Sequence, residues 1–462
     1  MKKTFALGLA TASLASTAIA QKPPLPMIED AAKTAMMEDR IAWEFVEALT
    51  TEIGPRMPGT PAEARAREWA MAWLKANGFA NVANEPFVMP TWVRGEERAS
   101  ITAPFMQPMH IAALGNSGST GAGGLTAEVV YFPTYADLVA ADAATLTGKI
   151  AFVSHDMRPA QDGSHYGFAG PARWTGPGIA AQKGAAAIVI RSIGTSNQRV
   201  SHTGNTNFPE GVAPIPSGAI SNPDADNLER MFARADGRPI TMNLLLTPRF
   251  IGEQESGNVV GEIVGRDRSL PPVLLACHLD SWDNGTGAFD DGAGCGIIAA
   301  AAKRVADMGR PLRTIRVLFA GAEEVGLWGS RAYSTAHVDE PFMVGLESDF
   351  GADRIWRLET NFTGSDPELY AELARVVAKL GVAPSGNVAT GGADLNVIRD
   401  QGGALIDLQQ DGMRYFDLHH TENDTLDKID PEQLRQNVGV WTAVVAVLAN
   451  HADPIERNAV AD

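Results

Sequence analysis

The second half of the sequence alternates apolar runs with helical stretches, and this order constrains the fold more than any other feature. The apolar runs are nearly continuous, as strands of a sheet buried on both faces require. Strand, turn and helix in repeated order indicate an α/β fold with a mostly parallel central sheet flanked by helices. The expected strands are residues 272–277, 314–320, 342–346 and 404–408, and the expected helices are residues 293–308, 367–380 and 431–452.

Side chains of the metal-binding types cluster where these strands end. In open α/β sheets, ligands bind beyond the carboxyl ends of the strands. Gathered carboxylates repel one another unless a cation holds them, so a solvated surface explains these clusters poorly. The clusters are His278-Leu279-Asp280, Asp290-Asp291-Gly292, Glu323-Glu324, Glu347-Ser348-Asp349 and the segment from His419 to Thr425. The sequence therefore predicts a metal site at this edge of the sheet.

The types of ligand favour zinc. Imidazole mixed with carboxylate, without a thiolate cluster, suits zinc best and cobalt or manganese next. Three acidic candidates, Asp290, Glu324 and Asp349, nearly balance the charge of two divalent cations, and a bound hydroxide would complete neutrality. Charge therefore favours two metal ions over one.

Taken in order, these motifs resemble peptidase family M28, the co-catalytic zinc exopeptidases. The register His420-x-x-x-Asp424-Thr425 completes the set, and residues 278–283 are especially similar to a carboxypeptidase branch of that family. The resemblance implies the zinc-exopeptidase fold and two zinc ions. It places one metal on His278 and Asp349 and the other on Glu324 and His420, with Asp290 bridging.

The resemblance also implies roles for residues beside the ligands. Glu323 is expected to act as general base on the attacking water and then as proton donor to the leaving amine. Asp280 lies two residues from His278 at a strand end, so both side chains emerge on one face and Asp280 can hold the imidazole. Asp424 is either a similar partner or a loop cap.

Two further expectations concern the same segments. The register selects His420 as the metal ligand and leaves its neighbour His419 as a candidate pocket residue. The resemblance implies a cis peptide between Asp290 and Asp291, a conformation that a non-proline residue adopts only where its surroundings enforce it.

The chain before and between these motifs divides into further parts. We predict residues 21–111 as the N-terminal part of the peptidase domain, residues 112–248 as an insert and residues 249–462 as its main part. Residues 28–78 are mainly helical in pattern, and Thr60 with Glu63 is typical of a capping box.

The insert resembles a smaller α+β protease-associated domain. The resemblance rests on Gly148-Lys149-Ile150 and Lys183-Gly184-Ala185. Its histidines, His155, His165 and His202, stand alone, and isolated histidines are more often structural residues than metal ligands, which need several partners. We therefore expect no catalytic group in the insert.

The first 20 residues are typical of a secretory signal peptide. Lys2 and Lys3 precede a short apolar run, and Ala18-Ile19-Ala20 ends it, which predicts cleavage after Ala20. The run is shorter than the roughly 20 residues that a membrane span needs, and no later segment is long and apolar enough. We expect a periplasmic or secreted protein.

Charge and cysteine content narrow the chemistry further. The formal net charge of −17 disfavours nucleic acid as a partner, because phosphate binding needs clustered Lys and Arg. The two cysteines, Cys277 and Cys295, could form a bridge or bind metal, but we expect two small buried apolar residues.

The function predicted from these features is that of an exopeptidase acting on short peptides. Which chain end it recognises stays open, and Asp394, Arg414 and Tyr415 are candidates for the substrate pocket. The alternatives are a non-catalytic receptor or binding module on the same fold and a glutaminyl-cyclase-like acyltransferase. Whether the chain forms a homodimer, with the insert as a dimerising or shielding element, also stays open.

Overall fold

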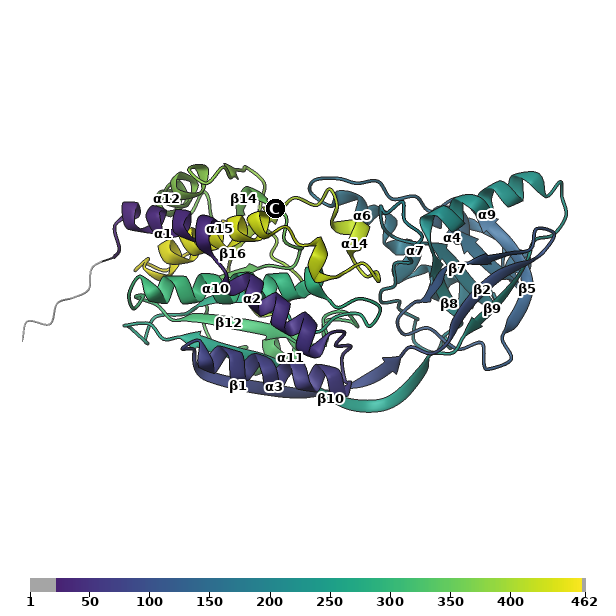
Figure 1. Ribbon diagram of the computed structural model, residues 1–462, viewed down its shortest axis with the longest axis horizontal. Coiled ribbons are helices and arrows are strands. Elements are labelled where there is room, and N and C mark those ends of the chain that lie inside the picture. Colours follow the sequence, from purple (N-terminus) through teal and green to yellow (C-terminus); the bar gives the residue numbers. More distant parts are fainter. Residues whose placement is uncertain (1–21, 459–462) are drawn as a thin grey trace, which may run out of the picture.

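The computed structural model describes residues 22–458 and contains two eight-stranded sheets. The expected signal peptide at residues 1–20 lies outside the described residues. Each sheet forms a unit of its own, and the two units lie side by side along the long axis of the molecule (Figure 1). Among the described residues, no helix combines the length and the apolar composition that crossing a bilayer requires.

The larger sheet contains the four predicted strands as β11, β12, β13 and β16, and their parallel pairing confirms the expected α/β core. Four other strands complete this sheet, and three of them, β1, β10 and β14, pair antiparallel with their neighbours. In spatial order the strands are β1 (Ala80–Val93), β10 (Arg249–Ile263), β12 (Ile315–Ala320), β11 (Val273–His278), β13 (Val344–Glu347), β16 (Ala404–Gln410), β14 (Ile355–Thr360) and β15 (Ala383–Pro384).

Both faces of the larger sheet are covered. Along β11, Leu275 and Cys277 belong to a core shared with one helical layer, whereas Leu274 and Ala276 belong to a second core on the opposite face. This alternation explains why the strand is apolar up to its last residue, His278. The first layer contains α1 (Leu25–Glu38), α2 (Ile41–Ala48), α3 (Pro61–Ala76), α10 (Ala293–Asp307), α12 (Pro367–Ala378) and α15 (Pro431–Ala449), and the second contains α11 (Trp328–Ala336) and α13 (Asn396–Asp400).

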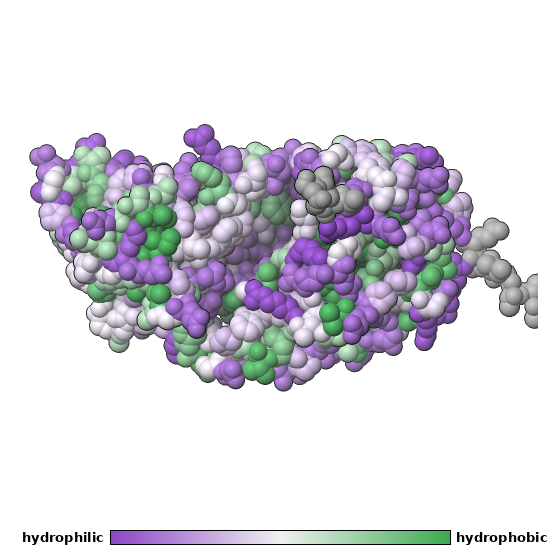
Figure 2. Space-filling view, turned by 180° about the vertical axis from the view of Figure 1, so that it is seen from behind, coloured by the Kyte–Doolittle hydropathy of each residue, from purple (hydrophilic) through white to green (hydrophobic). Residues whose placement is uncertain are grey.

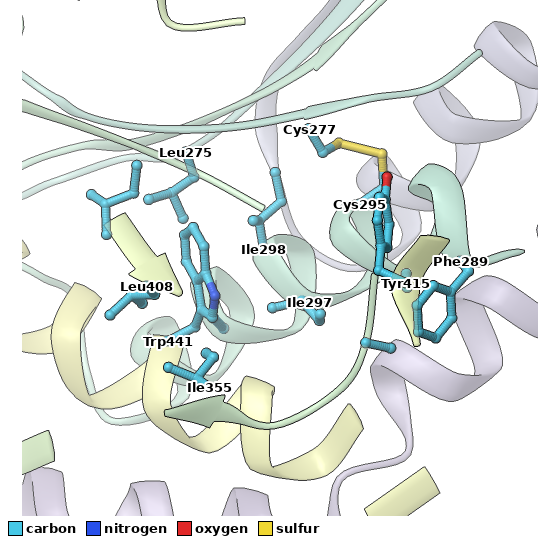
Figure 3. Close-up of a cluster of buried hydrophobic side chains, with 14 of the residues drawn as sticks. Leu275, Cys277, Phe289, Cys295, Ile297, Ile298, Ile355, Leu408, Tyr415 and Trp441 are labelled. Atoms are coloured by element: carbon cyan, nitrogen blue, oxygen red, sulfur yellow. A yellow bond between two sulfur atoms is a disulfide. The ribbon is translucent and has the colours of Figure 1, made fainter. Parts of the chain in front are cut away.

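The first core is built around α15, which lies among the other helices of its layer. Trp441 on this helix is almost fully buried and gathers with Leu275 of β11 and Ile298 of α10 (Figure 3). The helices predicted at residues 293–308, 367–380 and 431–452 are confirmed as α10, α12 and α15.

The amino-terminal cap of α3 differs in part from the expected capping box. The Thr60 hydroxyl accepts a hydrogen bond from the Glu63 N–H, as predicted. The Glu63 carboxylate, however, pairs with Arg67 and accepts a hydrogen bond from Ser256, so it does not return to the Thr60 backbone. A buried cation one turn further along the helix offers this carboxylate a stronger partner than the backbone does.

Cys277 and Cys295 form a disulfide, so the expectation of two unbonded cysteines is wrong. Strand β11 ends directly beside the first turn of α10, which brings the two Cα atoms to 5.3 Å (Figure 3). That separation lies within the range that a disulfide spans, and the sequence alone gives no sign of it. The bond ties the strand that carries His278 to the helix that follows Asp290.

We expect this disulfide to stabilise the larger unit. It closes a loop of 18 residues, for which chain-entropy arguments give roughly 3 kcal/mol. Denatured protein should take up no iodoacetamide before reduction and two labels per chain after it. Replacing both cysteines by alanine should lower the melting temperature by several degrees. Two labels without reduction would contradict the assignment.

The smaller sheet lies at one end of the molecule (Figure 1), and a separate hydrophobic cluster packs on one of its faces. In spatial order its strands are β3 (Gln107–Met109), β2 (Glu97–Ala103), β9 (Thr241–Leu246), β5 (Leu125–Phe132), β6 (Ile150–Val153), β7 (Ala187–Arg191), β8 (Ser217–Ile220) and β4 (Ile111–Ala113). Its helices are α4 (Tyr135–Ala140), α5 (Ala143–Leu146), α6 (Ser164–Ala169), α7 (Pro171–Trp174), α8 (Gly176–Gln182) and α9 (Asn222–Arg234). Because β2 and β3 pair with this sheet, we propose that the insert begins near residue 97 rather than at residue 112.

Candidate metal centre

The candidate ligands meet at the carboxyl ends of the parallel strands, as predicted from the sequence. His278 is the last residue of β11, and Asp349 follows β13 by two residues. Asp349 lines a cavity of about 510 Å³ where the smaller unit meets the larger one, and the surface is hollowed there (Figure 2). The residues of the larger unit around this cavity include Asp290, Glu323, Glu324, Asp349, Tyr415, His419 and His420.

His278, Asp290 and Asp349 form the first of two clusters. The His278 Nε2 atom lies 3.0 Å from Asp290 Oδ1 and 3.4 Å from Asp349 Oδ1. All three side chains point their ligand atoms at a common space, with one nitrogen and two oxygens close enough to share one ion. His278 and Asp290 are buried, and Asp349 is mostly so.

The second cluster contains His420, Glu324 and again Asp290. The His420 Nε2 atom lies 2.9 Å from Glu324 Oε2 and 3.4 Å from Asp290 Oδ2. Asp290 therefore directs one carboxylate oxygen to each cluster, the position that a bridging ligand occupies. His419 stacks on the His420 ring and reaches Asp290 only at 3.8 Å, which supports the choice of His420 as the ligand.

The donor set fits zinc. It combines two imidazoles with three carboxylates in a buried space, the mixture that zinc accepts. Asp290 Oδ2 and Glu324 Oε1 are buried and have no hydrogen-bond partner among the described residues. Burial raises the pKa of the Glu324 carboxyl well above its usual value, and the charge of Asp290 raises it further. A cation is the partner that this arrangement of acids requires.

Glu323 lies beside the two clusters, but its carboxylate takes part in none of the short contacts that define them. Its side chain lines the cavity, half-buried, next to Glu324. Burial raises the pKa of its carboxyl well above the usual value, and the negative charge of Asp349 acts in the same direction. A carboxyl with a raised pKa exchanges protons more readily near neutral pH than an ordinary one.

Asp280 acts on its neighbours in a different way from the one expected. The His278 Nδ1–H donates to the backbone carbonyl of Asp280 at 3.1 Å, whereas the Asp280 carboxylate lies 3.7 Å away, beyond hydrogen-bond distance. The carboxylate instead accepts hydrogen bonds from the backbone N–H groups of Glu323 and Glu324 at 3.2 and 3.3 Å. Asp280 thereby fixes the turn that carries the proposed base and a proposed ligand.

Asp424 holds backbone rather than imidazole. Its carboxylate accepts hydrogen bonds from the N–H groups of Phe289 and Asp290, at 2.6 and 3.2 Å. Of the two alternatives left open by the sequence, this contact is closer to a loop cap. The expected cis peptide between Asp290 and Asp291 is confirmed.

Several residues at the site were not singled out from the sequence. Arg56 is fully buried and donates to the carbonyls of Leu279 and Gly287, which hold the loop between the two metal-ligand segments. The smaller unit contributes Tyr166 and Arg173 to the cavity. These contacts join segments more than a hundred residues apart, so no local sequence pattern indicates them.

The three candidate pocket residues have different surroundings. Tyr415 lines the cavity, as expected. Arg414 forms two short contacts of 2.6 Å with Asp353 and lies outside the set that lines the cavity. Asp394 is buried, and neither of its carboxylate oxygens has a hydrogen-bond partner among the described residues.

Comparison with known proteins is consistent with this geometry. Residues 258–445 match the family model described as peptidase family M28. Carboxypeptidase Q of Bos taurus is 33% identical over 425 residues, covering 90% of this chain and 87% of that protein, and carboxypeptidase Q of Homo sapiens is 31% identical with the same coverage. These relatives confirm the likeness to a carboxypeptidase branch that residues 278–283 indicated.

Solved structures of similar proteins also match the chain. A peptidase M28 precursor from Shewanella amazonensis SB2B is 42% identical, with a TM-score of 0.90, and the match covers 95% of this chain and 99% of that one. A zinc aminopeptidase from Bacillus subtilis shares the fold at a TM-score of 0.63 and 22% identity, with coverage of 88% and 94%.

Proposed function

The chain belongs to peptidase family M28 and is a metallopeptidase, and we propose that it is a zinc-dependent exopeptidase that hydrolyses short peptides at a two-metal centre. Asp290 carries this proposal. Its two carboxylate oxygens face different clusters, one with His278 and Asp349 and the other with Glu324 and His420. A single carboxylate between two sets of ligands is the arrangement that two neighbouring ions need.

The ligands and Glu323 divide the chemistry between them. Zinc bound at this site supplies Lewis-acid chemistry, because it acidifies water and polarises the peptide carbonyl. Glu323 accepts the proton of the attacking water and returns it to the nitrogen of the leaving amine. Asp280 keeps Glu323 in reach of that proton by holding its backbone N–H.

We propose that the carboxylate end of the substrate is recognised by Arg173. This side chain is buried, lines the cavity and forms no ion pair with any carboxylate among the described residues. It donates to Tyr166 and to the carbonyl of Thr203, one of its terminal nitrogens lies 3.4 Å from His420 Nδ1, and its Nε–H has no partner there. A buried guanidinium without a counter-ion is costly unless an anion binds it, and a free α-carboxylate is the anion that a short peptide carries.

Replacing Arg173 by glutamine should remove the preference for a free carboxylate. We expect kcat/KM for a dipeptide to fall roughly 100-fold, because a buried carboxylate loses its charged partner, and kcat/KM for the matching dipeptide amide to stay within about threefold. The measurement compares both substrates for the wild type, Arg173→Gln and Arg414→Gln. An equal loss for acid and amide would contradict this role.

The proposed activity is tested by amino-acid release from a free dipeptide, an N-blocked dipeptide and an aminoacyl anilide. We expect zinc-loaded protein to cleave the free dipeptide. Cleavage of the anilide as well would assign an aminopeptidase, and cleavage of the N-blocked dipeptide a true carboxypeptidase. Absence of cleavage would instead favour a non-catalytic binding module. Cyclisation of a peptide with an N-terminal glutamine would favour an acyltransferase.

Three further expectations from the sequence join this proposal. We propose that the smaller unit is a protease-associated domain, that the protein is exported to the periplasm or secreted, and that a homodimer is its candidate assembly. Molecular mass in solution and the mass of the mature amino terminus test the last two.

A further inference from the structure

The segment that carries His420 is attached to the smaller unit as well as to the larger one. The Thr203 N–H donates to the His420 carbonyl at 3.0 Å, and Asn284 of the larger unit donates to the same oxygen at 2.8 Å. His420 itself has a φ of 61°, in the left-handed region that non-glycine residues rarely adopt. A residue in this conformation depends on its surroundings to stay there.

The Nδ1 side of the His420 ring also faces the smaller unit. Its Nδ1 lies 3.3 Å from the Thr203 carbonyl and 3.4 Å from a guanidinium nitrogen of Arg173, while its Nε2 faces Glu324 and Asp290. These two groups of the smaller unit occupy the Nδ1 side of the ring and leave Nε2 directed at the proposed metal position. The orientation of this proposed ligand therefore depends on contacts from the smaller unit.

His202 of the smaller unit makes a second contact, with His419, the residue that precedes His420. Its Nδ1–H donates to the His419 carbonyl at 2.8 Å, and its own N–H donates to Ser192 at 2.9 Å. The ring packs so closely on Gly194 that a Cβ there would lie 2.1 Å from it. His202 is thus a rigid donor rather than a surface histidine.

Residues before and after His419 and His420 also contact the smaller unit. Thr195 of the smaller unit donates to the Asp417 carboxylate at 2.7 Å, and His110 lies 2.9 Å from the Glu422 carboxylate. His278, in contrast, is the last residue of a strand of the larger sheet, and Asp349 lies two residues beyond another. The two clusters therefore differ in how they are supported.

We infer that residues 202–203 of the smaller unit position His420, so that the metal position formed by Glu324 and His420 depends on this contact and the position formed by His278 and Asp349 does not. The inference rests on the proposed two-metal centre. It makes His202 a positioning residue, and it gives the insert, from which we expected no catalytic group, an indirect part in metal binding through His420.

The test is a measurement of the two zinc dissociation constants of the full-length protein by competition with a chelator. His202→Leu keeps the volume of the side chain but removes the N–H donor, and His202→Asn restores a donor near the position of Nδ1. We expect His202→Leu to weaken one zinc site about 10- to 100-fold and to leave the other unchanged. His202→Asn should recover most of the affinity.

Two further variants complete the experiment. His155→Leu removes a buried histidine of the same unit that contacts Phe168 and Tyr135 instead, and should bind zinc as the wild type does. Thr203→Val loosens Thr203 from the Ala113 carbonyl, should weaken the same site as His202→Leu, and serves in its place if that variant does not fold. Unchanged constants, equal weakening of both sites, or the same loss in His155→Leu would overturn the inference. A wild type that binds a single zinc would overturn the proposed function with it.

Discussion

Glu323→Gln is expected to reduce kcat by about 10³-fold while leaving both zinc ions bound. The amide keeps the size of the side chain but cannot accept a proton, and general-base catalysis contributes roughly 10²–10⁴-fold in enzymes. Because Glu323 makes none of the short contacts of the two clusters, the ligand geometry should survive the change. The measurement combines single-turnover hydrolysis of a dipeptide with zinc analysis of the same sample.

The neighbouring glutamate provides the matched control. Glu324→Gln makes the same chemical change one residue along the chain, but at a side chain 2.9 Å from His420 Nε2. We expect this variant to lose zinc affinity and to regain part of its activity at high zinc concentration, which Glu323→Gln should not do. Comparable zinc loss in both variants would contradict the division of roles between these two residues.

Asp290→Asn should have the second large effect, because it disturbs both metal positions at once. The amide keeps the shape of the side chain but removes the charge shared by the two clusters. We expect loss of at least one zinc ion per chain and a fall in kcat/KM of at least about 10³-fold, since metal ions supply several kcal/mol of transition-state stabilisation. Zinc content and dipeptide hydrolysis measure the two effects.

Asp424→Asn is the comparison for this variant. Asp424 reaches the centre only through the backbone N–H groups of Phe289 and Asp290, and an asparagine oxygen can still accept one of these bonds. Its loss of activity should be at least tenfold smaller than that of Asp290→Asn. Retention of both zinc ions in Asp290→Asn would show that Asp290 is not a bridging ligand.

The parallel core could be predicted because its signal is local. A strand such as β11 is buried on both faces, so every residue in it before His278 is apolar and the run is visible in the sequence. The meeting of the candidate ligands could be predicted for a related reason, because ends of parallel strands meet at one edge and a shared chemical type marks each end. His278 and Asp349 illustrate both points.

The antiparallel pairing and the disulfide were not predicted, because the partners are distant in sequence or carry no distinctive pattern. Strand β1 pairs with β10 across the whole of the smaller unit, and much of its length is exposed or half-buried. Cys277 and Cys295 look the same in sequence whether bonded or free, and only the packing of α10 on β11 brings them together.

The contributions of the smaller unit to the site lie furthest from sequence reasoning. Arg173 approaches His420 from 247 residues away along the chain, and Thr203 from 217. Nothing in the spacing of an isolated arginine or histidine distinguishes such a contact from a solvated surface position. His202 was expected to be a surface or hydrogen-bonded structural residue rather than a metal ligand. The structure shows its hydrogen bond to the His419 carbonyl.

Zinc titration of metal-free protein, with bound zinc and dipeptide hydrolysis followed in the same sample, tests the two-metal centre most directly. Protein stripped of metal with a chelator should be inactive, and full activity should return only as the second zinc ion per chain is bound. Full activity at a single zinc ion per chain, or hydrolysis by metal-free protein, would contradict the account.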